Sequence, residues 1–178
     1  MLPWSGKNIY FLGFMASGKS RIGREFAQLL GWPFHDTDEL IESKAGKPIS
    51  RIFEQDGEAV FRRLEAEVVR ETALKKNNVV ALGGGAVIRD ENWRQISESG
   101  VTICLQAPAE VLAERIARNQ QRPLLADLTD EERIAKINAM LSERQSYYDR
   151  AQFTFSSTNN RPIAKFVQDI FNTLLEKL

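Results

Sequence analysis

Short apolar runs alternate along this chain with longer segments of helical periodicity, and this alternation limits the possible folds more than any other feature. The runs are too short and too continuous to be surface helices, which favours buried strands joined by helices. We expect strands at residues 8–12, 33–35, 78–82, 101–105 and 153–155. The predicted fold class is therefore α/β, with three layers: a mostly parallel five-stranded sheet flanked by helices.

The ends of several predicted helices can be recognised. Glycines follow the helical segments at about 18–30 and 90–99, as is common at helix C-termini. Thr129 and Glu132 have the spacing of a capping box that opens a long helix. Because no repeat or flexible linker interrupts the chain, we expect residues 1–178 to form one domain.

Two segments fit neither the sheet nor its covering helices. Residues 48–76 contain two helical pieces split at Gly57, so we expect a helical insertion at about 37–76. The stretch at about 119–128 joins two helices and has no periodicity of its own. Next to a ligand site, such a polar, proline-containing connection would be a lid, whereas without a site a plain surface loop is the simpler interpretation.

Composition excludes several classes of protein. With 178 residues, 43% of them apolar and 27% charged, the chain can bury a core and is not of the disordered type. The 24 basic and 24 acidic side chains cancel, so we expect neither nucleic acid nor a membrane surface as a partner. Cys104, the only cysteine, lies in an apolar run and is expected to be a buried strand thiol. No targeting or membrane-spanning pattern is seen, and the expected location is the cytoplasm.

The segment after the first predicted strand carries the most specific chemical signal. Gly13-Phe14-Met15-Ala16-Ser17-Gly18-Lys19-Ser20 matches Gly-x4-Gly-Lys-Ser/Thr, the phosphate-binding P-loop, between a strand and a helix. Backbone N–H groups and the helix N-terminus can point at phosphate oxygens there. Lys19 would bridge the β- and γ-phosphates of a nucleotide, and the Ser20 hydroxyl would ligate Mg²⁺.

An acidic partner for the metal is expected at the end of a later strand. The third predicted strand ends in glycines instead, so the nearest acids are Asp36 and Asp38 after the second strand. Two residues apart in an extended chain, they would point the same way into one cleft. Alternatively, Asp38 is the N-cap of a helix at 39–44. His35 lies inside the strand and is most simply a satisfied core or rim histidine.

Two arginines suggest how a second, acidic substrate is held. Arg62 borders an apolar stripe on the predicted helix 58–75, with Glu65 one turn further, and alone it would be a solvated salt bridge. Arg144 occupies a seam position of the long helix where an apolar side chain is expected, and a buried arginine needs an anion. Together with an aspartate they describe a pocket for a small molecule that carries a carboxylate and hydroxyls. Three glycines at 83–85 could place backbone N–H groups against it.

These residues resemble the shikimate kinases over nearly the whole chain. The markers are the P-loop, Asp36-Thr37-Asp38, Ile52-Phe53-Glu54-Gln55-Asp56-Gly57-Glu58 leading to Phe61-Arg62-Arg63-Leu64-Glu65, Gly83-Gly84-Gly85, Arg122-Pro123-Leu124-Leu125 and Arg144-x-x-x-Tyr148. The resemblance implies a P-loop kinase fold of the nucleoside-monophosphate-kinase type, with the helical insertion binding the acceptor and the stretch 119–128 acting as the lid. It also implies transfer of the ATP γ-phosphate to the 3-hydroxyl of shikimate, which yields shikimate 3-phosphate and ADP on the way to chorismate and the aromatic amino acids.

The resemblance further implies a role for each site residue. The catalytic residues would be Lys19, Asp38 and Arg122. ATP would contact Ala16, Ser17, Gly18, Lys19, Ser20, Arg21, Arg115, Arg122 and Arg161, with Arg115 stacking on the adenine. Shikimate would contact Asp38, Arg62, Gly83, Gly84, Gly85 and Arg144. Mg²⁺ would be held by Ser20 and Asp36, and the enzyme is expected to be a monomer whose partners are ATP and shikimate.

Departures and rival interpretations remain at this point. Ala16 stands where many members of the family carry glycine, and at a positive φ it would cost on the order of 1 kcal/mol, which concerns ATP affinity. Residues 1–6 lie outside the resemblance and are expected to be frayed. One rival is a P-loop kinase for a sugar acid or a nucleotide. The two arginines and three glycines favour a carboxylated polyol over a nucleotide base, and the family markers favour the shikimate kinases over both. Another is a kinase-like protein that has lost catalysis and only binds. It is disfavoured because the expected catalytic and metal-binding residues are all intact: Lys19, Ser20, Asp36, Asp38 and Arg122.

Overall fold

The protein is described from a computed structural model that covers residues 2–118, 128–158 and 161–178. The strands are β1 (Asn8–Leu12), β2 (Phe34–Asp36), β3 (Val79–Ala81), β4 (Gly100–Gln106) and β5 (Phe153–Ser156). The helices are α1 (Lys19–Leu30), α2 (Thr37–Ala45), α3 (Ile49–Gln55), α4 (Glu58–Ala73), α5 (Asp90–Ser99), α6 (Ala109–Arg118), α8 (Asp130–Tyr148) and α9 (Ile163–Lys177). The five strands pair in the order β2-β3-β1-β4-β5 and every pairing is parallel, which confirms the predicted fold class.

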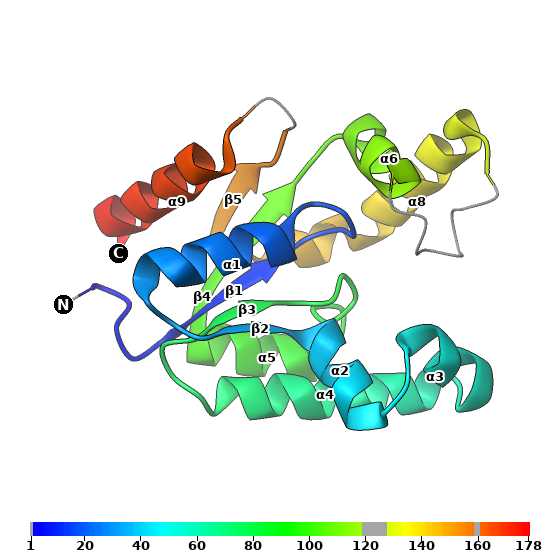
Figure 1. The fold of residues 1–178 in the computed structure, drawn as a ribbon, viewed down its shortest axis with the longest axis horizontal. Coiled ribbons are helices and arrows are strands. Elements are labelled where there is room, and N and C mark those ends of the chain that lie inside the picture. Colours follow the sequence, from blue (N-terminus) through cyan, green and yellow to red (C-terminus); the bar gives the residue numbers. More distant parts are fainter. Residues whose placement is uncertain (1, 119–127, 159–160) are drawn as a thin grey trace.

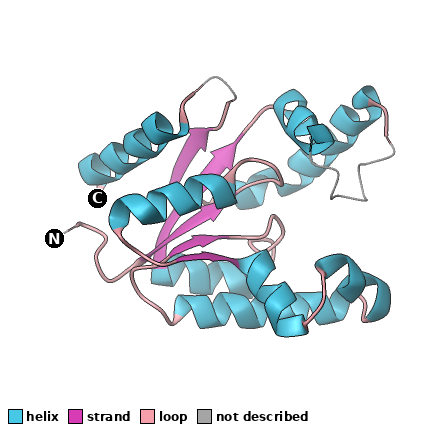
Figure 2. Ribbon diagram, viewed as in Figure 1, coloured by secondary structure: helices cyan, strands magenta, loops and turns pink. Residues whose placement is uncertain are grey.

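Helices cover both faces of the sheet (Figure 2), and the alternation of side chains along β1 separates two cores on these faces. Ile9 and Phe11 pack with the apolar faces of α1 and α9, whereas Tyr10 and Leu12 pack with those of α4, α5 and α8. All five residues of β1 are buried, as a central parallel strand requires. The protein thus has three layers, two of helices and one of strands (Figure 1).

The helical insertion has a small core of its own. Ile41 on α2, Ile52 on α3, and Phe61 and Val68 on α4 form a separate buried cluster beside the β2 edge of the sheet. In Figure 1, α2 and α3 lie at the lower right against α4, which runs on below the sheet. They carry Asp38 and Arg62 to residues 83–85, which lie next to the P-loop.

The N-terminal segment is docked, so the expectation that it is frayed was wrong for the described residues. The Trp4 side chain is 1% exposed and meets the Phe171 ring of α9 edge-on, with 5.8 Å between ring centroids. The backbone N–H of Gly6 donates to Asn77 Oδ1 at 2.7 Å. Burial of the large Trp4 side chain outweighs the ordering of a short polar segment.

Several boundaries and burials match the sequence-based predictions. The capping box forms, because Thr129 Oγ1 accepts from the Glu132 N–H at 3.3 Å while the Glu132 carboxylate accepts from the Thr129 N–H at 2.9 Å. Cys104 is buried in β4, and burial raises the pKa of its thiol to about 12. In the described ranges, no helix combines the length and apolar character needed to cross a bilayer.

Candidate active site

The P-loop joins β1 to α1 in a conformation that depends on glycine. Gly13 has φ of 133°, and a Cβ there would lie 2.4 Å from the Leu105 carbonyl oxygen, so no side chain fits. Gly18, at the start of α1, has φ of 98°. The Lys19 ammonium donates to the carbonyl oxygens of Gly13 and Phe14 at 2.9 and 2.8 Å, which holds its charge over the loop. The arrangement is that of an anion cradle at a helix N-terminus.

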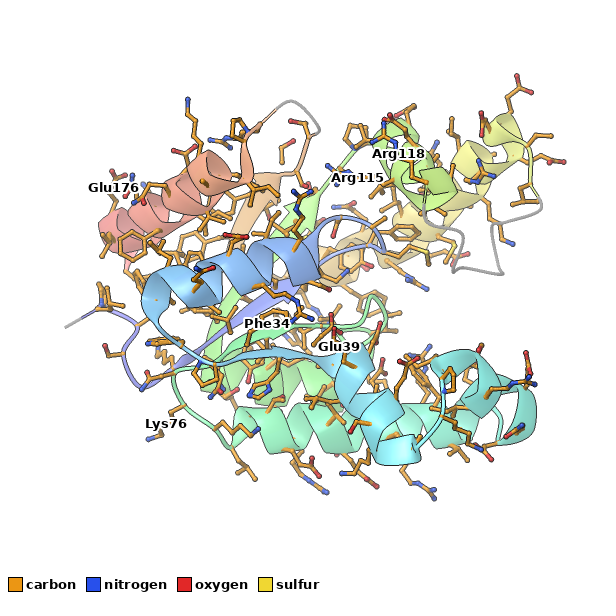
Figure 3. All side chains as sticks on the ribbon, in the orientation of Figure 1. Phe34, Glu39, Lys76, Arg115, Arg118 and Glu176 are labelled. Carbon is orange, nitrogen blue, oxygen red and sulfur yellow. The ribbon has the colours of Figure 1, made fainter. Side chains whose placement is uncertain are left out.

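Ala16 takes the left-handed conformation that its place in the P-loop raised as a concern. Its φ is 59°, in a region where an alanine is strained by about 1 kcal/mol relative to glycine. Arg115 on α6 donates to the Ala16 carbonyl oxygen at 3.1 Å, and to the Ser157 hydroxyl and carbonyl oxygens at 3.2 Å each. Arg115 therefore joins the P-loop to the connection between β5 and α9 (Figure 3). Burial lowers the pKa of its guanidinium.

The two residues expected to hold Mg²⁺ lie in direct contact. The Ser20 hydroxyl donates to Asp36 Oδ2 at 2.5 Å. The other oxygen of the same carboxylate, Oδ1, accepts from the Asp38 N–H at 3.0 Å, which makes Asp36 the N-cap of α2. The alternative that Asp38 caps this helix is therefore wrong. Asp38 lies in the first helical turn and not in an extended strand, because α2 begins at Thr37.

A hydroxyl and a carboxylate suit Mg²⁺, which prefers oxygen ligands. Among the described residues, no cluster of three or more His, Cys, Asp or Glu side chains could enclose a metal ion. Mg²⁺ in kinases usually keeps several waters, binds the substrate phosphates directly and is held by only one or two protein oxygens. The pair Ser20 and Asp36 fits that pattern, beside the P-loop where the phosphates would lie.

The three glycines after β3 each lie against one candidate residue of the acceptor pocket. A Cβ on Gly83 would be 2.6 Å from Asp38 Oδ1, and a Cβ on Gly85 would be 2.9 Å from a guanidinium nitrogen of Arg62. A Cβ on Gly84 would be 3.5 Å from a guanidinium nitrogen of Arg144. The fold therefore brings together three side chains from α2, α4 and α8 around one glycine segment.

Arg62 is held by acids of its own helix. It donates to both oxygens of Glu65, at 3.2 and 3.0 Å, and to Glu58 at 3.2 Å. The ion pair read from the sequence is thus present, but it is only partly solvated, because Glu65 is 1% exposed. Burial raises the pKa of the Glu65 carboxyl, and the charge of Arg62 opposes that rise. The exposed pair with Glu58 is worth little and can be exchanged for a ligand carboxylate.

Arg144 keeps its place in the seam of α8 but is half-buried. Its guanidinium lies 5.7 Å from the centre of the Phe14 ring of the P-loop. Within the part of the chain that the structure describes, Arg144 has no ion pair with a carboxylate. One turn further along, the Tyr148 hydroxyl donates to the Gly84 carbonyl oxygen at 3.0 Å. Burial raises the pKa of this hydroxyl, and the nearby Arg144 charge opposes the rise.

The remaining predicted residues are spread more widely. Ser17 is fully buried, and its hydroxyl finds no hydrogen-bond partner among the described residues. Arg21 is exposed on the first turn of α1. Arg161 pairs with Asp169 on α9 and lies 5.0 Å from the centre of the Phe166 ring, so it does not face the P-loop. Arg122 and the lid stretch 119–127 lie outside the described residues.

Sequence reasoning missed two contributors to the acceptor side. Thr37 Oγ1 accepts from the Gly83 N–H at 2.8 Å and so holds the start of the glycine segment. Phe53 on α3 is 41% exposed and packs on Phe61, with 4.7 Å between ring centroids, while Arg62 lies 5.2 Å from the centre of the Phe61 ring. An aromatic pair beside an arginine was visible in the sequence, but its exposure was not.

Comparison with known proteins agrees with this geometry. The family model described as shikimate kinase matches residues 15–175. A shikimate kinase of Thermodesulfovibrio yellowstonii is 40% identical over 156 residues, covering 88% of each chain.

Among solved structures, shikimate kinase from Acinetobacter baumannii in complex with shikimate is 36% identical, with a TM-score of 0.86 over 97% of this chain and 95% of that one. The shikimate kinase from Bacteroides thetaiotaomicron is 34% identical, with a TM-score of 0.89 over 94% and 98%. The chain therefore belongs to the shikimate kinase family and is an ATP-dependent kinase.

Proposed function

We propose that this enzyme transfers the γ-phosphate of ATP to the 3-hydroxyl of shikimate, forming shikimate 3-phosphate and ADP. The observation that carries the proposal is the gathering of Asp38, Arg62 and Arg144 around one glycine segment, beside a P-loop. A carboxylated polyol is the ligand class that two arginines and an aspartate select. The solved complex of a 36%-identical relative with shikimate supports the same acceptor.

At the phosphate end, the backbone N–H groups of Ala16, Ser17 and Gly18 and the N-terminus of α1 would bind the phosphates. Lys19 would leave the carbonyl oxygens that it now contacts and stabilise charge that develops between the β- and γ-phosphates. Ser20 and Asp36 would hold Mg²⁺, which supplies neutralisation of the phosphate charge when bound. Phosphoryl transfer needs mainly positioning and charge stabilisation, and these residues provide both.

At the acceptor end, Asp38 would accept a hydrogen bond from the reacting hydroxyl and so aim its oxygen at the phosphorus. Arg62 and Arg144 would bind the carboxylate from two sides, in the forked geometry that arginine shares with carboxylates. The N–H groups of the glycine segment would lie against the ring, because no side chain stands in the way. The loose transition state requires an oriented hydroxyl more than a strong base.

The residues near the adenine of ATP and the lid complete the proposal. Arg115 would exchange part of its contact with Ser157 for stacking on the adenine, and Arg161 would have to turn away from α9 to reach the nucleotide. Arg122 would contact the transferring phosphoryl group, as the family resemblance implies for this stretch beyond the described residues. We also propose that the enzyme is a single-domain monomer of the cytoplasm.

An assay of ADP release with and without shikimate tests the function. We expect release to depend on shikimate and on Mg²⁺, and to fall by roughly 10-fold or more at a fixed low shikimate concentration in Arg62→Lys, because lysine cannot reproduce the forked contact. Arg63→Lys, a change at the exposed neighbour, is the matched control and should match wild type. ADP release that ignores shikimate, or that responds instead to gluconate or a nucleoside monophosphate, would contradict the proposal.

A further inference from the structure

The glycine segment of the acceptor pocket is held in place by side chains from other elements. Residues 83–88 form turns with only two backbone hydrogen bonds of their own, from Ala86 to Gly83 and from Ile88 to Gly85. Three of its carbonyl oxygens accept side-chain donors instead, as follows: Gly84 from the Tyr148 hydroxyl, Ala86 from Asn92 Nδ2 and Val87 from the Arg150 guanidinium. The position of the segment is therefore set by tertiary contacts, not by its own backbone.

Among these donors, Arg150 joins the largest number of elements. It lies just past the C-terminus of α8 and donates both to the Val87 carbonyl oxygen and, at 2.9 Å, to Asp90 at the start of α5. Its guanidinium also packs against the rings of Trp93 on α5 and Tyr147 on α8, 4.6 and 5.1 Å from their centres. One side chain thus ties α8, α5 and the end of the glycine segment together.

The contacts of Arg150 add little to the stability of the fold, but they strongly restrict the position of its guanidinium. The Asp90 side chain is 91% exposed, so its ion pair with Arg150 contributes little to the stability of the fold. The Nε atom of Arg150 is buried with no partner among the described residues, which costs free energy. In contrast, two donors and two adjacent rings leave the planar guanidinium little freedom to move. Its main consequence is therefore the spacing between α8 and the glycine segment.

We propose that Arg150 is a positioning residue for the acceptor. It acts through Val87 and α8 to set how Gly84 and Gly85 face Arg144, and so it tunes the affinity for the carboxylated substrate without touching it. The proposal rests on the proposed function, because the pocket it serves is the shikimate site. Nucleotide binding should be spared, since Arg150 has no contact with the P-loop in the described structure.

Steady-state kinetics of Arg150→Met and Arg150→Lys test the proposal. Arg94→Met, which removes an arginine charge from an exposed position of α5, is the control. We expect Arg150→Met to raise the KM for shikimate roughly 10-fold, because a displaced binding group loses much of its contact, while the KM for ATP changes less than about twofold. Arg150→Lys can still reach Val87 and should restore part of the loss. An unchanged KM for shikimate, or equal increases in both KM values, would overturn the proposal.

Hydrogen exchange provides a readout that does not depend on activity. The amides of Ala86 and Ile88 should exchange about 10-fold faster in Arg150→Met, while the amides of β1 exchange as in wild type. If Arg150→Met folds slowly or in poor yield, the same exchange measurement is made on Asp90→Asn, which weakens only the contact between Asp90 and Arg150. If wild type releases no ADP with shikimate, the proposed function fails, whereas unchanged exchange at these two amides overturns the role of Arg150 alone.

Discussion

The phosphate side and the acceptor side of this enzyme are built in different ways. Residues 13–20 form the proposed phosphate cradle from one continuous stretch, with its shape set by glycines and by the start of α1. The proposed acceptor pocket combines Asp38, Arg62 and Arg144 from three helices with a glycine segment from a fourth part of the chain. The first site is local chemistry, and the second exists only when the helices are packed.

This difference predicts how each side responds to change. On the phosphate side, the backbone does much of the binding, so a lost side chain should damage the reaction more than the fold. On the acceptor side, each arginine also takes part in packing: Arg62 lies over Phe61, and Arg144 lies beside Phe14. Substitutions there should change binding of shikimate and local stability together. Five substitutions test this contrast.

The largest effect is expected for Lys19→Ala. Removal of the one charged donor that the motif places by the β- and γ-phosphates should cost about 3–4 kcal/mol of transition-state stabilisation, a fall of ~10²–10³ in kcat. The free energy of unfolding should change little. Stopped assays and urea denaturation measure the two quantities, and a folded variant that keeps more than about a third of wild-type kcat would remove this lysine from the mechanism.

Arg144→Lys should give the next largest effect, on the acceptor side. Lysine keeps the charge but cannot make two parallel hydrogen bonds to a carboxylate, which should cost about 1.5–3 kcal/mol, or roughly 10- to 150-fold in kcat/KM for shikimate. The KM for ATP should stay near that of wild type. An analogue of shikimate without the carboxylate provides the control, because it should be poor with wild type and hardly poorer with the variant. An equal penalty on both acceptors would exclude Arg144 from carboxylate binding.

Asp36 and Asp38 lie on the boundary between the two sides. We expect their asparagine variants to have different defects. Asp36→Asn should raise the Mg²⁺ concentration needed for half-maximal rate by about 10-fold, because an amide is a weaker partner for the ion and for Ser20. Asp38→Asn should leave nucleotide binding unchanged and weaken the binding of shikimate by about the same factor. Calorimetric titration with ATP and with shikimate measures both. Equal losses of ATP affinity in the two variants would contradict this division.

Ala16→Gly should give the smallest effect, and its direction is favourable. The positive φ of Ala16 belongs to the folded P-loop itself, so we expect its strain to reduce the free energy of unfolding more than the affinity for ATP. Glycine should therefore raise the free energy of unfolding by up to about 1 kcal/mol, with nucleotide Kd nearly unchanged. Ala117→Gly on the exposed face of α6 is the control and should destabilise instead. A tighter Kd without added stability would place the strain in the complex.

Elements defined by local patterns were predicted well. β1 and α5 have the bounds that the apolar run and the flanking glycine indicated, and the capping box at Thr129 formed. Predictions that depended on the local direction of the chain, and so on where a side chain points, were less accurate. The sequence places Asp36 and Asp38 two residues apart, but only the structure shows that the chain turns into α2 between them, so that Asp36 caps the helix that carries Asp38. Trp4 likewise gave no local signal, because its partner Phe171 lies near the other end of the chain.

By itself, the sequence determined the α/β class, the phosphate cradle and the family, because each depends on residues close together in the chain or on a set of motifs read in order. Tertiary structure alone decided that Gly83, Gly84 and Gly85 lie against Asp38, Arg144 and Arg62, respectively. It also decided that the side chains of Arg150 and Tyr148 donate hydrogen bonds to carbonyl oxygens of this segment. Local motifs are set by backbone geometry and hydrogen bonds within a few residues. Contacts between distant segments depend on how whole helices pack on the sheet, and no short stretch of sequence records that packing.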